Sequence, residues 1–182
     1  MGFPPVGRWH SGTFSKSKAI LLLFKAPCRP ARAGSKEVRG LSEARISVAE
    51  FERIARERVP FTQSIGAVVE DIQPGHLRAR APFREDFVRP GGTIAGPVLM
   101  ALADLCMYGA VLSLIGPVEL AVTTNLNINF LRRPRPGTIV AEATVLKLGK
   151  RLAVGEVRLY SEESGDLVAH VTSTYSIPPD RA

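Results

Sequence analysis

One carboxylate, Asp104, lies inside a mostly apolar stretch that extends from Ile94 to Ile115. Burying an ionised carboxylate among apolar side chains is costly, so such a residue is usually paired with polar groups or used in chemistry. The non-functional alternative is a core carboxylate that is hydrogen-bonded to its neighbours. We treat Asp104 as a candidate catalytic residue, acting as a general base or as a nucleophile.

The sequence Gly92-Thr93-Ile94-Ala95-Gly96-Pro97 suits the entry into a helix. Pro97 fits the first turn, where its missing N–H is not needed, and Gly96 allows the backbone to approach another group closely. Backbone N–H groups at a helix N-terminus favour negative charge. Gly96 is therefore a candidate for polarising a carbonyl, although simple helix-entry geometry would also explain a glycine there.

The elements that must position these residues follow from hydrophobic periodicity. Ser47 and Glu50 form a capping-box pattern that predicts a short helix ending before Pro60. Two strands follow, and four more come after the long apolar helix; the predicted strands cover residues 65–72, 77–83, 120–130, 139–145, 153–160 and 167–175. This order predicts an α+β fold in which an antiparallel sheet wraps one long central helix.

The strand predicted over residues 120–130 alternates apolar and polar side chains. Its apolar face is expected to carry Leu120, Val122, Leu126, Ile128 and Phe130, and its polar face Thr123, Asn125, Asn127 and Asn129. The asparagine row is interpreted as a polar sheet face or a contact between subunits.

The net charge of +7 comes from one end of the chain. Residues 1–36 contain seven Lys and Arg and no Asp or Glu, so the rest holds 17 residues of each sign. A neutral body gives no reason to expect a nucleic-acid partner. We expect a basic extension over residues 1–44 and one folded domain over residues 45–182. The extension is interpreted as disordered or as an early start assignment, with an organellar presequence as the alternative.

The stretch 94–115 is long enough to span a membrane. Against that alternative, Asp104 near its centre costs about 2.5–3.5 kcal/mol on insertion scales, and a helix apolar on every side equally suits a buried core. We therefore expect no membrane partner.

The chain has two cysteines, Cys28 and Cys106, and no Cys-x-x-Cys. We therefore expect no disulfide framework, and we expect a reducing, cytoplasmic compartment.

Residues 47–178 resemble the hotdog fold, and their motif is similar to that of the phenylacetate-degradation (PaaI-type) acyl-CoA thioesterases. Those enzymes carry His-Gly-Gly at the start of the central helix and an Asp eight residues after the first Gly. Here Ala95, Gly96 and Pro97 occupy the three places, and Asp104 falls eight residues after Gly96. The resemblance implies hydrolysis of an acyl- or aryl-CoA thioester without a cofactor or metal.

The chain departs from the family pattern at three places. The motif His is Ala95, the second Gly is Pro97, and Arg89 and Pro90 fill the region where an upstream Asn is common. The Gly whose N–H matters is retained, and Ala95 and Pro97 are expected at the substrate. Thr123 lies where the family often has a Ser or Thr near the catalytic water; its alternative is a surface strand residue.

The spacing of Gly96 and Asp104 has a consequence for assembly. Eight residues of one helix span about 12 Å, too far for both groups to reach one thioester. Two antiparallel helices facing each other across a dimer would bring Gly96 of one chain to Asp104 of the other. The spacing, like the resemblance, predicts a homodimer with shared sites, or a dimer of such dimers.

Several basic residues are candidates for binding the phosphates of CoA, with simple solvation as the alternative: Arg132, Arg133, Arg135, Lys150 and Arg151. None of the three histidines falls in the motif, which argues against the hotdog dehydratases. No metal-ligand cluster is visible in the sequence.

Two function classes remain: an acyl-CoA thioesterase, which the retained Asp104 favours, and a non-catalytic acyl-CoA binder or sensor, which the lost motif His favours.

Overall fold

The computed structural model describes residues 42–179. The expected basic extension therefore lies almost wholly outside the described residues and is a prediction still. The elements are α1 (Val48–Arg58), η2 (Pro60–Ile65), β1 (Val68–Gln73), β2 (His76–Ala81), η3 (Glu85–Phe87), β3 (Val88–Arg89), β4 (Thr93–Ile94), α2 (Gly96–Ile115), β5 (Val122–Phe130), β6 (Ile139–Leu148), β7 (Leu152–Ser161) and β8 (Leu167–Ser176). The predicted order of elements is confirmed, with short elements added before α2.

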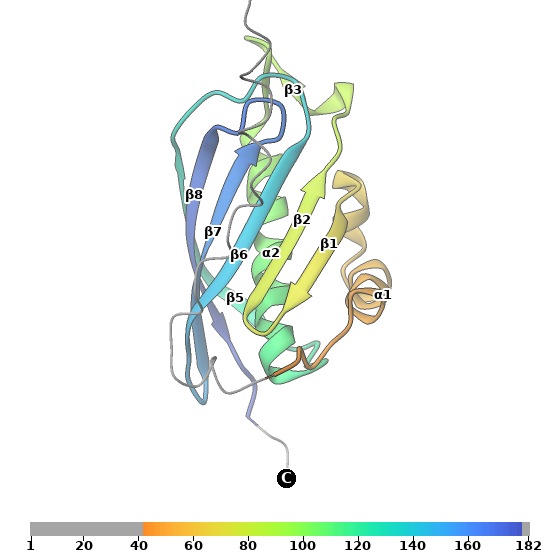
Figure 1. The fold of residues 1–182 in the computed structure, drawn as a ribbon, viewed down its shortest axis with the longest axis vertical. Coiled ribbons are helices and arrows are strands. Elements are labelled where there is room, and N and C mark those ends of the chain that lie inside the picture. Colours follow the sequence, from red (N-terminus) through yellow and green to blue (C-terminus); the bar gives the residue numbers. More distant parts are fainter. Residues whose placement is uncertain (1–41, 180–182) are drawn as a thin grey trace, which may run out of the picture. The chain divides into compact units, whose positions relative to one another are not determined.

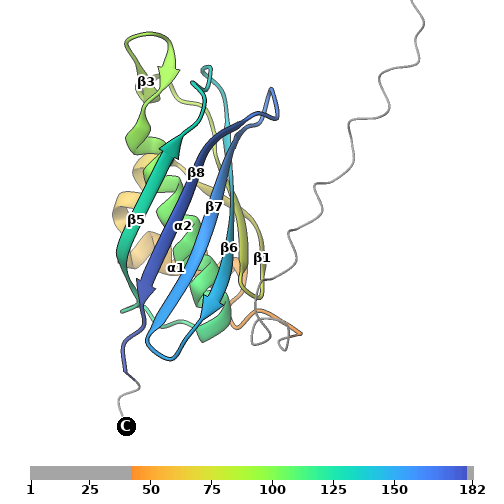
Figure 2. The same cartoon turned by 90° about the vertical axis from the view of Figure 1, so that its left-hand side faces the viewer.

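Six of the strands form one antiparallel sheet in the order β1-β2-β6-β7-β8-β5. The sheet curves around α2, and α1 lies beside β1 (Figure 1). The turned view shows β5 at the sheet edge opposite β1, running alongside α2 (Figure 2). This is the α+β architecture of a sheet wrapped around one central helix that the sequence predicted.

Helix α2 is the core of the domain. Its most apolar 18-residue window has a mean hydropathy of 2.1, and 78% of that window is buried inside the domain. A helix of this length and composition could cross a membrane, but here most of its apolar surface is already covered within the domain. Gly109 permits the close approach, because a Cβ there would collide with the Leu77 side chain and lie 2.9 Å from Cζ of Phe51.

The helix predicted from the capping box is confirmed. Oγ of Ser47 accepts a hydrogen bond from the Glu50 amide at 3.2 Å, and α1 ends at Arg58. The strand expected over residues 65–72 begins late, at Val68. Its first residue, Ile65, belongs instead to the 3-10 helix η2, which Gly66 ends in the left-handed conformation with φ of +57°.

The prediction of which side chains of β5 point inward is wrong at the start of the strand. A β-bulge between Thr123 and Asn125 leaves Thr124 without a partner position on β8. The extra residue reverses the alternation, so Thr123 points inward with Leu126 while Val122 is 55% exposed. The asparagines of β5 are exposed, as expected of a polar face.

Candidate active site

Two hydroxyl groups hold one oxygen of the Asp104 carboxylate. Oγ1 of Thr123 donates a hydrogen bond to Oδ1 at 2.6 Å. The Tyr175 hydroxyl donates to the same Oδ1 at 2.8 Å and lies 3.1 Å from the Asp104 carbonyl oxygen. Among the residues that the structure describes, none donates a hydrogen bond to Oδ2. The carboxylate is thus fixed through one oxygen, and the other is left for a ligand or water.

The sheet register explains why both hydroxyls reach Asp104. Thr123 on β5 is directly opposite Tyr175 on β8, so the two side chains share the face that packs on α2. The bulge at Thr124 turns Thr123 toward that face. The structure therefore brings the two sequence-predicted residues Thr123 and Asp104 together, while the predicted role of Thr123 near the catalytic water stays a prediction.

Tyr175 was not among the predicted site residues. The alternation of residues 167–175 put it on an apolar face, where a core tyrosine is the ordinary expectation. Its side chain is 2% exposed. Burial raises the pKa of its hydroxyl, and the neighbouring Asp104 carboxylate raises the pKa further, so the group remains a protonated donor.

Asp104 opens onto a cavity of about 270 Å³ between α2, the α1–η2 segment and the start of β5. Apart from Asp104, Thr123 and Tyr175, its walls are formed mainly by apolar and aromatic side chains: Val59, Phe61, Ala101, Leu105, Tyr108, Ala121 and Val122, with Thr62 and Glu119. Phe61 is 67% exposed at this cavity, so a large aromatic surface faces solvent there. The cavity suits an apolar group placed next to a carboxylate.

At the start of α2, the Gly96 N–H is a free backbone donor. Pro97 has no N–H, and the Val98 N–H donates to the Ala95 carbonyl at 3.1 Å. Within residues 42–179, no group accepts a hydrogen bond from the Gly96 N–H, and the Ala95 side chain provides no cap. A free amide at a helix N-terminus is the kind of donor that stabilises an oxyanion.

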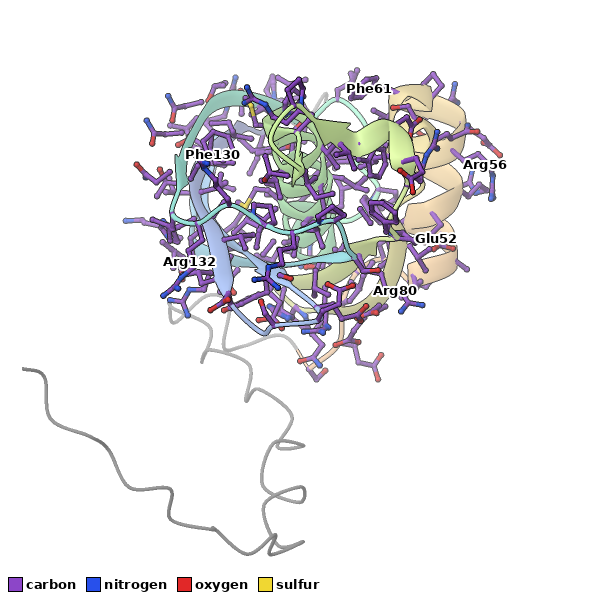
Figure 3. The ribbon with its side chains drawn as sticks, turned by 90° about the horizontal axis from the view of Figure 1, so that it is seen from above. Glu52, Arg56, Phe61, Arg80, Phe130 and Arg132 are labelled. Carbon is purple, nitrogen blue, oxygen red and sulfur yellow. The ribbon has the colours of Figure 1, made fainter. Side chains whose placement is uncertain are left out.

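Gly96 lines a second cavity, of about 300 Å³, which does not include Asp104. Phe130 also lines it, and a Cβ on Gly96 would lie 3.1 Å from Cζ of that ring. Seen from above, Phe130 lies on the β5 side of α2 and Phe61 on the α1 side (Figure 3). The two candidate catalytic groups of one chain therefore belong to different cavities, as the 12 Å helix spacing requires (about eight residues at 1.5 Å).

The predicted phosphate-binding residues divide into two groups. Arg132 and Arg133 line the Gly96 cavity, together with Arg89, and continue with Arg135 into a neighbouring cavity of about 730 Å³. Lys150 and Arg151 lie in the turn between β6 and β7, at the opposite end of β6. In one chain the first group is near Gly96, and the second is not.

The histidines in the described residues lie away from both cavities. His170 pairs with Glu156 at 3.0 Å, and Nδ1 of His76 lies 3.4 Å from Oγ1 of Thr144. Burial lowers the pKa of His76. No group of three or more His, Cys, Asp or Glu side chains within residues 42–179 could hold a metal ion. Cys106 is a buried thiol whose pKa is raised by burial.

Comparison with known proteins decides the family. The family model of the thioesterase superfamily matches residues 91–168, which include Gly96, Asp104 and Thr123. A protein of Saccharolobus solfataricus named "putative esterase" is 31% identical over 132 residues, which cover 72% of this chain and 86% of that protein. The chain belongs to the thioesterase superfamily.

Solved structures agree with this assignment to the thioesterase superfamily. A "putative thioesterase" from a Silicibacter species is 39% identical, with a TM-score of 0.68 over 75% of this chain and 95% of the other. A mutant of the phenylacetic acid degradation protein PaaI of Thermus thermophilus is 31% identical with a TM-score of 0.59, over 65% of this chain and 99% of that one. The fold is the hotdog fold, and membership places the chain among hydrolases that act on thioesters.

Proposed function

We propose that the protein is an acyl-CoA thioesterase, which hydrolyses an acyl- or aryl-CoA thioester to the free acid and CoA. The observation that carries the proposal is the Asp104 carboxylate, which is held through Oδ1 by two hydroxyls while Oδ2 has no protein donor among the described residues. Asp104 also lines a largely apolar cavity. A protein that only bound an acyl group would gain nothing from a partly buried carboxylate there, because its desolvation is costly.

The proposed reaction uses the Gly96 amide of one subunit and the Asp104 carboxylate of the other, because the two groups of one helix are about 12 Å apart. The Gly96 N–H donates to the thioester carbonyl oxygen and stabilises the negative charge that forms on it. Oδ2 of Asp104 takes a proton from water as the water oxygen bonds to the carbonyl carbon. The C–S bond then breaks, and the thiolate of CoA takes up the proton. As a nucleophile, Oδ2 would instead form a mixed anhydride that water hydrolyses.

We propose a homodimer, or a dimer of such dimers, as the active form. One face of α2 is at least partly exposed, although the other residues of the helix before Ile115 are buried: Gly96, Pro97, Met100, Ala101 and Asp104. Their spacing of three and four residues makes a continuous stripe. A second α2 packed antiparallel on this stripe would cover it and bring each Gly96 to the partner's Asp104 cavity. The neighbouring edge strand β5 is free to extend the sheet.

The acyl group is assigned to the cavity beside Asp104 and the phosphates of CoA to Arg132 and Arg133. The two arginines line the same cavity as the Gly96 amide, so the nucleotide part would leave the site on that side. Ala95 and Pro97 flank the amide and would contact the thioester. Lys150 and Arg151 lie at the far end of β6, away from Gly96 of the same chain, so in a shared site they would contact the phosphates only of a ligand bound beside the partner's Gly96. We expect the enzyme to work in the cytoplasm.

The second candidate is a non-catalytic acyl-CoA binder or sensor. The observation that favours it is Ala95, which stands where the family motif has His and offers no side-chain group at the head of α2. A panel of alkyl- and aryl-CoA thioesters separates the two functions. The enzyme releases free thiol from at least one of them, whereas the binder takes up acyl-CoA without hydrolysis.

Complementation tests the shared site. Asp104→Asn and Gly96→Pro each remove one of the two groups, so each homodimer should be inactive. Mixing and refolding the two variants produces heterodimers in which one of the two sites keeps both groups, and activity should partly return. A fully active monomer in sedimentation, or proven heterodimers without rescue, would exclude the shared site.

A further inference from the structure

We propose that Tyr175 is a positioning residue, which, together with Thr123, fixes Oδ1 of Asp104 so that Oδ2 faces the substrate cavity. The proposal rests on the function proposed for Asp104 and extends it to a residue that the motif does not include. Tyr175 lies on β8, the last strand within residues 42–179, far along the sequence from the helix that carries Asp104.

The geometry gives the Tyr175 hydroxyl a defined task. It lies 2.8 Å from Oδ1 and 3.1 Å from the carbonyl oxygen of the same residue, so it contacts both the side chain and the backbone of Asp104. Hydrogen bonds to charged acceptors are about twice as strong as neutral ones. The hydroxyl has one hydrogen, and the shorter distance assigns it to Oδ1, so the bond holds that carboxylate oxygen at a fixed position relative to the buried ring.

The Tyr175 ring is itself held in place. It is almost fully buried and stacks on Tyr108, with ring centroids 6.2 Å apart and planes inclined by 19°. Tyr108 in turn packs against Phe51 at a centroid distance of 5.8 Å. Thr123, by contrast, is only partly buried on the edge strand. We therefore assign the orientation of Asp104 mainly to Tyr175, because its hydroxyl is carried on a rigid, buried ring.

Other titratable groups near the carboxylate are few in the described residues. The Asp104 cavity includes the hydroxyl of Tyr108, which donates to the Glu119 carbonyl at 3.2 Å, and the Glu119 carboxylate, which pairs with Arg58 at 3.1 Å. Neither hydrogen-bonds to Asp104. A change in the pH dependence of catalysis on loss of the Tyr175 hydroxyl would therefore report on the contact to Asp104.

The test is Tyr175→Phe in the full-length protein, assayed over a range of pH with a hydrolysed acyl-CoA. We expect kcat to fall by about 10- to 100-fold, the range for losing a hydrogen bond to a charged group, with KM changed little. The acid limb of kcat/KM should move to higher pH, because a carboxylate that loses a donor is protonated more easily. As the control, Tyr160→Phe removes a tyrosine hydroxyl on β7, which lines neither the Asp104 cavity nor the Gly96 cavity, and should leave that limb in place.

Two further variants keep the outcomes distinct. If Asp104→Asn hydrolyses the substrate at the wild-type rate, the proposed function itself fails. If Asp104→Asn is inactive but Tyr175→Phe keeps the wild-type kcat and acid limb, only the positioning role is excluded. Should Tyr175→Phe not fold, replacing Tyr175 by 3-fluorotyrosine keeps the ring and makes its hydroxyl a stronger donor. The acid limb should then move to lower pH, and an unmoved limb would overturn the proposal.

Discussion

The two halves of α2 have nearly the same apolar composition and different surroundings. From Gly96 to Asp104 one face of the helix is buried and the other is at least partly exposed, and Asp104 is the last residue of this half. From Leu105 to Leu114 every residue is buried. Composition alone does not separate the halves, but the sheet covers only the second one completely. We infer that the first half serves the reaction and the second half the stability of the domain.

Replacing Asp104 by Asn should have the largest effect on activity. The amide keeps the shape of the side chain but cannot take a proton, and loss of a general base typically lowers kcat by about 10²–10⁴-fold. The melting temperature should change little, because Asp104 lies on the exposed side of the helix. Steady-state kinetics and thermal unfolding of the same preparation measure both. A variant that loses activity only because it unfolds would contradict the division of α2.

Gly96 offers a matched pair of variants at the other end of the exposed half. Gly96→Pro removes the free N–H, and loss of one oxyanion donor costs about 10²–10³-fold in kcat. Gly96→Ala keeps the N–H and adds a Cβ 3.1 Å from the half-exposed Phe130 ring, which a small shift of the ring relieves. The alanine variant should therefore retain far more activity than the proline variant. Equal losses in both would point to a packing role for Gly96.

Gly109→Ala probes the buried half. The added Cβ would collide with Leu77 and lie 2.9 Å from Phe51, and overpacking of this kind typically costs about 1–3 kcal/mol of folding free energy. Chemical denaturation should show this loss, while kcat of the folded fraction stays near the wild-type value. A stable variant with a large loss of kcat would show that the second half of α2 also serves the reaction.

The smallest expected effect is at the phosphate-binding arginines. Arg132→Gln or Arg133→Gln should raise KM for acyl-CoA by roughly 2- to 5-fold each, since an exposed ion pair is worth about 0.2–1 kcal/mol. The increase should shrink at high salt, and kcat should stay unchanged. Lys147→Gln, at an exposed position near the far end of β6, is the control. An unchanged KM in both arginine variants would move the phosphates of CoA to another surface.

The comparison also explains what the sequence could predict. Local patterns predict the extent of α2 and single out Gly96 and Asp104. These patterns are a long apolar stretch, a Gly-Pro pair at its start and one carboxylate within it. They do not single out Tyr175, because its role depends on its register opposite Thr123 and on packing against α2, which no local pattern encodes. The faces of β5 were predicted wrongly since alternation assumes a regular strand, and a bulge adds one residue without changing composition. Strand β1 began late because Pro60 starts a 3-10 helix.

The extra residue Thr124 has a consequence for how this protein can change. Oγ1 of Thr124 donates a hydrogen bond to the Thr174 carbonyl oxygen at 3.1 Å, which holds the bulge against strand β8. A chain that lacked this one residue could keep α2, the core and the order of strands, yet it would turn Thr123 toward solvent and leave Asp104 with one hydroxyl. The loss of one residue from the edge strand would thus change the hydrogen bonds to the carboxylate without changing the fold.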